Sequence, residues 1–120
     1  MPSLNTFGAI LTYAINLEES LSDFYEAAGD SDRAKEATKR KKNLERVRRE
    51  NVVEITLEAI DGLDENDYDF NFDDTSEGGQ QAAEATAARF YEDVAPKINV
   101  RQAQRVLERY AGQHAGLANA

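Results

Sequence analysis

The stretch TFGAILTYAINLEESLSDFYEAA, residues 6–28, decides the fold of this chain of 120 residues. Its apolar residues recur at alternating steps of three and four positions: Phe7, Ile10, Ala14, Leu17, Leu21, Phe24 and Ala28. This spacing is typical of a helix that packs nearly parallel to its neighbours. Thr6 suits the N-cap position, and Gly29 suits a left-handed residue after the last turn. The stretch therefore predicts a bundle helix from about Thr6 to Ala28.

A motif within this stretch occurs again 66 residues later. Glu18 is followed by Phe24-Tyr25-Glu26, and Glu84 is followed by Phe90-Tyr91-Glu92. A glutamate and a tyrosine seven residues apart lie on one face of a helix, two turns from each other. A weaker repeat follows each copy, as Leu44-Glu45-Arg46 and Leu107-Glu108-Arg109. We therefore expect an α-helical hairpin that is used twice.

The first predicted hairpin spans residues 6–62. Its second helix begins at a cap among Asp30, Ser31 and Asp32 and contains no glycine or proline until about Asp61. Glu50 and Glu54 stand one turn apart on this helix beside an apolar stripe, so we expect one or both to be substantially buried. A buried carboxylate needs a compensating cation, either a metal ion or an arginine.

Residues 63–76 form the predicted connection between the hairpins. They are too polar for a helix, and Tyr68, Phe70 and Phe72 alternate with acidic residues and asparagine. This pattern predicts an extended acidic strap that crosses the length of the bundle with its aromatic rings turned inward. The second hairpin spans residues 77–115, with one helix from Glu77 to Ala95 and another that starts after Asn99, capped by Asn99 together with Gln102.

Composition limits the classes of function. The net charge of -9 argues against nucleic acid as a partner. The chain has no cysteine, which excludes disulfides and thiolate sites and is compatible with a cytoplasmic protein. No apolar stretch is long enough to span a membrane, so we expect no membrane partner. Nine of the fourteen basic residues lie between Arg33 and Arg49, and residues 61–77 hold eight acidic residues and no basic one. We expect these two regions to pair within or between subunits, or the basic helix 33–49 to bind a protein partner.

Two helical hairpins joined by a long crossover, each beginning with a glutamate ahead of Phe-Tyr-Glu, resemble the ferritin-like superfamily, especially rubrerythrins and encapsulated ferritins. The resemblance implies one all-α domain, residues 1–120, folded as a ferritin-like four-helix bundle. It also implies a di-metal site of iron or manganese, with one glutamate from each of the first and third helices and Glu-x-x-His from the second and fourth. The matching metal ligands are Glu18, Glu84, Glu50 (with Val53 at the histidine position) and Glu108 (with Ala111 there). Tyr25 and Tyr91 match tyrosines that orient ligands.

The sequence departs from that pattern because both expected histidines are missing. His114 lies six residues after Glu108 and points to another side of the helix, so we expect a core residue rather than a ligand. The position of a residue along the helix axis can be compared between the two helices of each predicted hairpin. On this basis about Lys42 lies opposite Glu18, and about Tyr110 lies opposite Glu84. Glu108 therefore lines up with its partner, whereas Glu50 does not.

Two functional hypotheses remain open. In one, Glu18, Glu50, Glu84 and Glu108 hold iron or manganese for oxidation or storage, and no arginine lies among them. In the other, a ferritin-like scaffold has lost its metal and serves as a structural or interaction module, and arginine stands at the site. The sequence contains no catalytic set of its own, so enzymatic activity stays undecided. We expect a homo-oligomer, a dimer or larger, because two chains could complete a bundle between them.

Overall fold

The computed structural model describes residues 4–51, 60 and 62–119. In this part of the chain the fold is all-α, as predicted, with four α-helices and two 3-10 helices of three residues: α1 (Phe7–Ala28), α2 (Ser31–Glu50), η2 (Glu65–Asp67), α3 (Glu77–Val94), η3 (Ala95–Lys97) and α4 (Arg101–Ala118). None of the described helices is long and apolar enough to cross a membrane.

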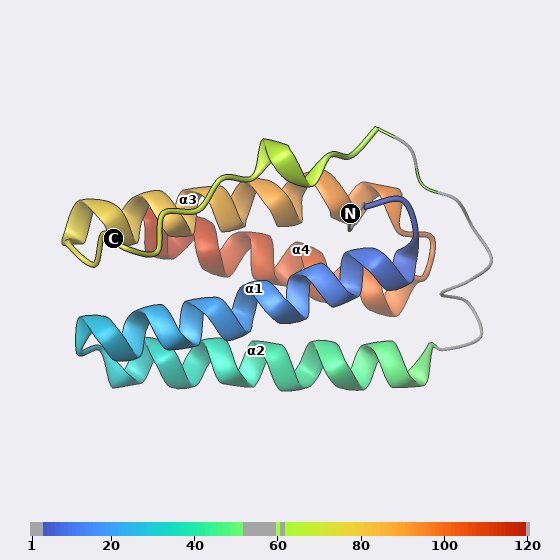
Figure 1. Cartoon of the computed structure of the whole chain (residues 1–120). Coiled ribbons are helices and arrows are strands. Elements are labelled where there is room, and N and C mark those ends of the chain that lie inside the picture. Colours follow the sequence, from blue (N-terminus) through green and yellow to red (C-terminus); the bar gives the residue numbers. More distant parts are fainter. Residues whose placement is uncertain (1–3, 52–59, 61, 120) are drawn as a thin grey trace.

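Both ends of α1 lie where the sequence predicts. The Thr6 hydroxyl accepts a hydrogen bond of 3.0 Å from the backbone N–H of Ala9, and Gly29 adopts the left-handed conformation at φ 82°. Asp30 then caps α2 by accepting from the backbone N–H of Arg33 at 3.1 Å. A two-residue connection with these caps reverses the chain, so α1 and α2 run antiparallel side by side (Figure 1).

Helix α2 ends at Glu50, with Asn51 at its C-cap. The predicted continuation to about Asp61 falls mainly on residues 52–59 and 61, which lie outside the described residues. The described helix is amphipathic, and its buried face consists of Ala34, Ala37, Arg40, Leu44 and Val47. An arginine on that face is the one charged residue among small and apolar neighbours.

Residues 62–76 run along α3 from the end of the molecule where α2 stops to the end where α3 begins (Figure 1). The predicted inward orientation of the aromatic residues is confirmed: Tyr68 is buried, and Phe70 and Phe72 pack against the core. The Tyr68 hydroxyl donates to Asp93 on α3 at 2.5 Å. The sequence pattern did not indicate η2, the 3-10 turn within this strap.

The turn of the second hairpin lies later in the chain than predicted. After α3 the chain forms η3, and α4 begins at Arg101 with Val100 at the N-cap and no side-chain cap. The predicted cap of Asn99 with Gln102 is wrong, because the Gln102 side chain instead donates to Glu50 at 2.9 Å. The later turn shifts the register of α4 against α3. Residues beyond Tyr110 thereby come level with Glu84.

Candidate functional site

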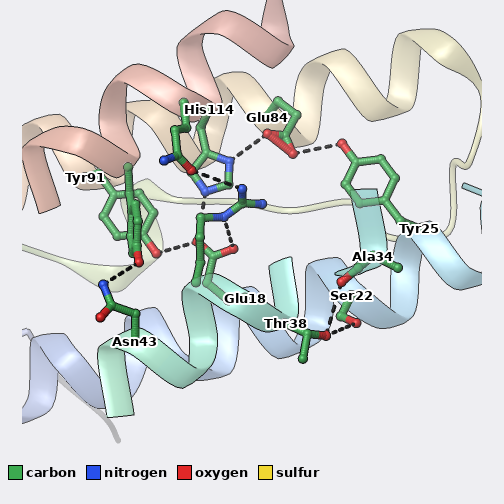
Figure 2. A network of polar contacts seen from close by, with 12 residues as sticks. Glu18, Ser22, Tyr25, Ala34, Thr38, Asn43, Glu84, Tyr91 and His114 are labelled. Atoms are coloured by element: carbon green, nitrogen blue, oxygen red, sulfur yellow. Dashed lines mark hydrogen bonds and ion pairs between the residues drawn. The ribbon is translucent and has the colours of Figure 1, made fainter. Parts of the chain in front are cut away.

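Four charged or ionisable side chains meet in the interior of the bundle, one from each helix. Glu18 comes from α1, Arg40 from α2, Glu84 from α3 and His114 from α4. Glu18, Glu84 and His114 are 0% exposed and Arg40 is 4% exposed. Charged groups are rarely so deeply buried unless they are paired. Figure 2 shows this network, which we call the central site.

His114 bridges the two glutamates. Its Nδ1 lies 2.6 Å from Glu84 Oε2, and its Nε2 lies 2.8 Å from Glu18 Oε2. An imidazole can donate from both nitrogens only when it is protonated, and ionised carboxylates are acceptors only. The geometry therefore fits an imidazolium between two carboxylates. The ring of Tyr91 stacks on the imidazole with centroids 5.4 Å apart and fixes its plane.

Arg40 is the second cation of the site. Its Nε donates to Glu18 Oε1 at 2.8 Å, and its Nη1 reaches the side-chain oxygen of Gln113 at 3.4 Å. Its Nη2 is buried and has no hydrogen-bond partner in the described part of the chain. Burial lowers the pKa of Arg40, but the carboxylate of Glu18 outweighs burial and raises that pKa overall. Arg40 is thus a permanent positive charge inside the bundle.

Two tyrosines complete the site, and each one bonds to the glutamate of the other repeat. Tyr25 on α1 donates to Glu84 Oε1 at 2.8 Å, and Tyr91 on α3 donates to Glu18 Oε2 at 2.5 Å. Burial and the adjacent carboxylate raise the pKa of both phenols, so they remain protonated donors. The repeated glutamate and tyrosine thus join α1 to α3 in two related contacts.

The charges of the central site balance. Burial alone lowers the pKa of His114, but hydrogen bonds and attraction from Glu18 and Glu84 outweigh it and raise that pKa above 6.5. Burial alone raises the pKa of Glu18, but His114, Arg40 and Tyr91 together lower it below 4.5. With His114 protonated, as its two carboxylate acceptors require, the two glutamate side chains face one imidazolium and one guanidinium, and these ionised forms balance in the core.

The four predicted metal ligands fall into two groups. The structure brings Glu18 and Glu84 together across His114, but Glu50 and Glu108 are both exposed on the surface. Glu50 is not the buried member of the pair Glu50 and Glu54, since its carboxylate is exposed and accepts from Gln102 at the end of α2. Glu54 lies outside the described residues. The four glutamates do not form one cluster.

Sequence analysis missed the roles of Arg40 and His114. The residue predicted to lie opposite Glu18 is Lys42, only two positions from Arg40. The same comparison therefore could have identified Arg40 as a neighbour of Glu18. The residue predicted to lie opposite Glu84 is Tyr110, because the predicted helices leave the turn at residues 96–99, earlier than the observed turn at residues 98–100. His114 is a core residue, as expected. Only the later start of α4 places it at the glutamates.

The central site as arranged does not fit a divalent metal ion. Each of the four carboxylate oxygens of Glu18 and Glu84 already accepts a hydrogen bond from a protein donor. Both nitrogens of His114 face carboxylates, so neither presents a free lone pair. In the described residues, no three carboxylate or imidazole side chains are placed to hold one metal. The two cations provide the neutralisation that a metal would otherwise provide.

No protein-family model, no curated protein and no solved structure matches this chain. The class of protein is therefore defined by the structure alone. The described residues form an all-α fold of four α-helices and two short 3-10 helices around a buried polar centre in which carboxylates face cations.

Proposed function

We propose that this chain is a ferritin-like four-helix bundle, made of two related hairpins joined by the strap as a crossover. In its central site, Arg40 and His114 neutralise the glutamates in place of metal ions. The bundle then serves as a structural or interaction module. The packing of α1 along α2 and of α3 along α4, with the strap running the length of α3, supports the fold part of this proposal (Figure 1).

One observation carries the proposal: Arg40 Nε lies 2.8 Å from Glu18 Oε1, with both side chains almost fully buried. A divalent ion bound to Glu18 would stand beside a fixed guanidinium, and two like charges at that range repel strongly where water is excluded. This is the arginine that the scaffold hypothesis predicts among the glutamates. A carboxylate site for iron or manganese predicts its absence.

The spacing of residues on α2 and α4 supports the same interpretation. The resemblance to ferritin-like proteins implies a Glu-x-x-His pair on each of these helices at the level of the two single glutamates. At that level α2 carries Arg40 with Asn43, and α4 carries Ala111 with His114. Of the four positions only His114 keeps a residue able to bind a metal, and its ring nitrogens are both occupied.

Metal retention tests the proposal. Untagged protein is mixed anaerobically with iron(II), or separately with manganese(II), desalted and analysed for metal. We expect no stoichiometric retention. One or two ions retained per chain or per dimer, lost in Glu18→Gln and Glu84→Gln but kept in Glu50→Gln and Glu108→Gln, would overturn the proposal. The last two variants are matched controls because their carboxylates are exposed.

The Arg40→Glu variant tests whether the guanidinium is what keeps metal out. It places a third carboxylate beside Glu18 and Glu84 and removes the cation, so we expect this variant alone to retain manganese(II). Circular dichroism with and without the metal shows whether the variant folds.

Size-exclusion chromatography with light scattering on the wild type tests the expected dimer or larger assembly.

A further inference from the structure

A groove between α2 and α4 is lined mainly by basic side chains. It has a volume of about 660 Å³, within the range of ~300–1,000 Å³ usual for small-molecule sites. Five basic residues line it besides Arg40: Lys39 and Arg46 from α2 and Arg101, Arg105 and Arg109 from α4. All five are exposed. We call this feature the arginine groove.

The positive charge of the arginine groove is not neutralised within the described chain. Arg46, Arg101, Arg105 and Arg109 form no ion pair with any described acidic residue. Glu36 is the acidic residue in the lining, and it pairs with Lys39 at 3.3 Å. The excess of arginine is notable because the whole chain has a net charge of -9. A concentrated basic surface on an acidic protein favours an anionic ligand.

The arginines of α4 are placed as a row. Arg101, Arg105 and Arg109 stand at successive steps of four residues, so they share one face of the helix and span ~12 Å along its axis. Like charges at this spacing repel each other and destabilise a helix, and an anion bound across the row would turn that repulsion into attraction to the ligand. Arg46, from α2, faces the same groove from the opposite side.

A buried donor lies beneath this row. Arg40 lines the groove with its side chain only 5% exposed, and its Nη2 has no hydrogen-bond partner among the described residues. A buried guanidinium donor left unpaired costs free energy, which is recovered when an acceptor reaches it. The groove therefore combines a rim of exposed cations with an unsatisfied cationic donor in its buried lining.

The acidic strap of the same chain does not fill the groove. Arg89 on α3 donates to the backbone oxygen of Asp67, and Tyr68 donates to Asp93 on α3, which together hold the strap on that helix. In the described residues no ion pair joins residues 63–76 to residues 33–49, so the expected pairing of these two regions is not found within the chain. The arginines remain available to a ligand.

We propose that the arginine groove binds an oligophosphate, either free or as the phosphate chain of a nucleotide. The planar guanidinium fork matches phosphate oxygens in two parallel hydrogen bonds, and several arginines facing one another suit a short chain of linked, multiply charged groups. The concave shape and the size of the groove suit one small ligand. The groove shares Arg40 with the central site, but its exposed cations are residues that the central site does not use.

Calorimetric titration with sodium tripolyphosphate at low ionic strength tests the site. The variant Arg101→Gln, Arg105→Gln, Arg109→Gln removes the row on α4. The control Lys35→Gln, Lys42→Gln, Arg49→Gln removes the same charge from exposed positions outside the groove. We expect saturable binding at one site per chain. The groove variant should weaken it at least about tenfold, since several charge-assisted hydrogen bonds are lost, and the control should change Kd by less than about threefold.

Titration with ATP shows whether the groove binds a free phosphate chain or the phosphate chain of a nucleotide. Tighter binding of ATP than of tripolyphosphate would show that the groove also contacts the nucleoside, and equal or weaker binding of ATP would assign the site to the phosphate chain alone. Three results would overturn the proposal. These are no saturable binding of either compound, equal weakening in both triple variants, or a wild-type dimer without phosphate binding that dissociates in the groove variant. The last result would assign the groove to contact with a second copy.

Discussion

Tyr91 donates a hydrogen bond of 2.5 Å to Glu18, although the two residues belong to different helices, α3 and α1, and to different copies of the repeat. The reciprocal contact joins Tyr25 to Glu84 at 2.8 Å. Each glutamate therefore depends on the other helix for its phenol donor. These two hydrogen bonds fix how α1 and α3 pair, beyond the non-directional attraction of their apolar faces.

Removing either phenol should destabilise the fold. We expect Tyr91→Phe and Tyr25→Phe each to lower the free energy of unfolding by ~1–3 kcal/mol, because a buried carboxylate loses a donor. Tyr13→Phe is the control, since the Tyr13 ring packs on Phe90 at 4.7 Å but its hydroxyl makes no hydrogen bond to a described residue. Its expected change lies within ~0.5 kcal/mol. Urea denaturation measures all three, and equal small losses would show that the phenols act only as packing groups.

The pair of Arg40 and Glu18 should show strong energetic coupling. Replacing Arg40 by methionine leaves a buried carboxylate short of one cation, which costs ~3–5 kcal/mol when a buried pair is broken from one side. In the double variant Arg40→Met, Glu18→Gln that carboxylate is gone, so the combined loss should be smaller than the sum of the single losses by ~0.5–3 kcal/mol. A complete double-mutant cycle by chemical denaturation measures the coupling. Additive losses would contradict a direct buried ion pair.

Stability should depend on pH through His114 and Glu18. The pKa of His114 is raised above 6.5 in the folded state, so its contribution is full below about pH 6.5 and is lost as pH rises through the folded value. The pKa of Glu18 is lowered below 4.5, so its contribution is full above about pH 4.5 and is lost as pH falls through the folded value. These two groups together place the highest free energy of unfolding between pH 4.5 and 6.5.

The His114→Gln variant isolates the alkaline side of that profile. Glutamine keeps a hydrogen-bonding side chain but cannot be protonated, so the loss of stability between pH 6.5 and 9 should become much shallower than in the wild type. Unfolding followed by circular dichroism across this range gives the comparison. An unchanged alkaline slope in the variant would mean that other groups, and not the imidazolium between Glu18 and Glu84, control it.

The parts of the fold that depend on local signals were predictable from the sequence. The limits of α1, the Asp30 cap and the inward aromatic residues of the strap follow from capping chemistry and periodicity. The composition of the central site depended on register, which a small change in one turn alters. Because η3 and residues 98–100 delay the start of α4, His114 and not Tyr110 lies level with Glu84. The sequence does not indicate this later start of α4, because the pattern of Asn99 and Gln102 predicts an earlier one.

Two adjacent glycines at the start of α3 should respond in opposite ways to alanine. A Cβ on Gly79 would clash with the backbone oxygen of Asp74, so the strap could not approach the helix as it does. A Cβ on Gly78 would meet only the Ser76 hydroxyl at 3.9 Å, an ordinary contact. We therefore expect Gly79→Ala to destabilise the protein by ~1–3 kcal/mol through overpacking. Gly78→Ala should stabilise it by ~0.4–1 kcal/mol, because alanine restricts the unfolded chain more than glycine does.

Thermal and urea unfolding of the two variants measure this difference in sign. The substitutions are chemically identical, one position apart, and both lie in the first turn of α3, so helix propensity alone predicts the same gain for both. A stabilising effect at Gly79 equal to that at Gly78 would mean that the strap does not pack against the helix at Asp74. A loss at Gly79 alone would show that the end of the strap is held in contact with α3, where the Ser76 hydroxyl accepts from the backbone N–H of Gly79 at 3.2 Å.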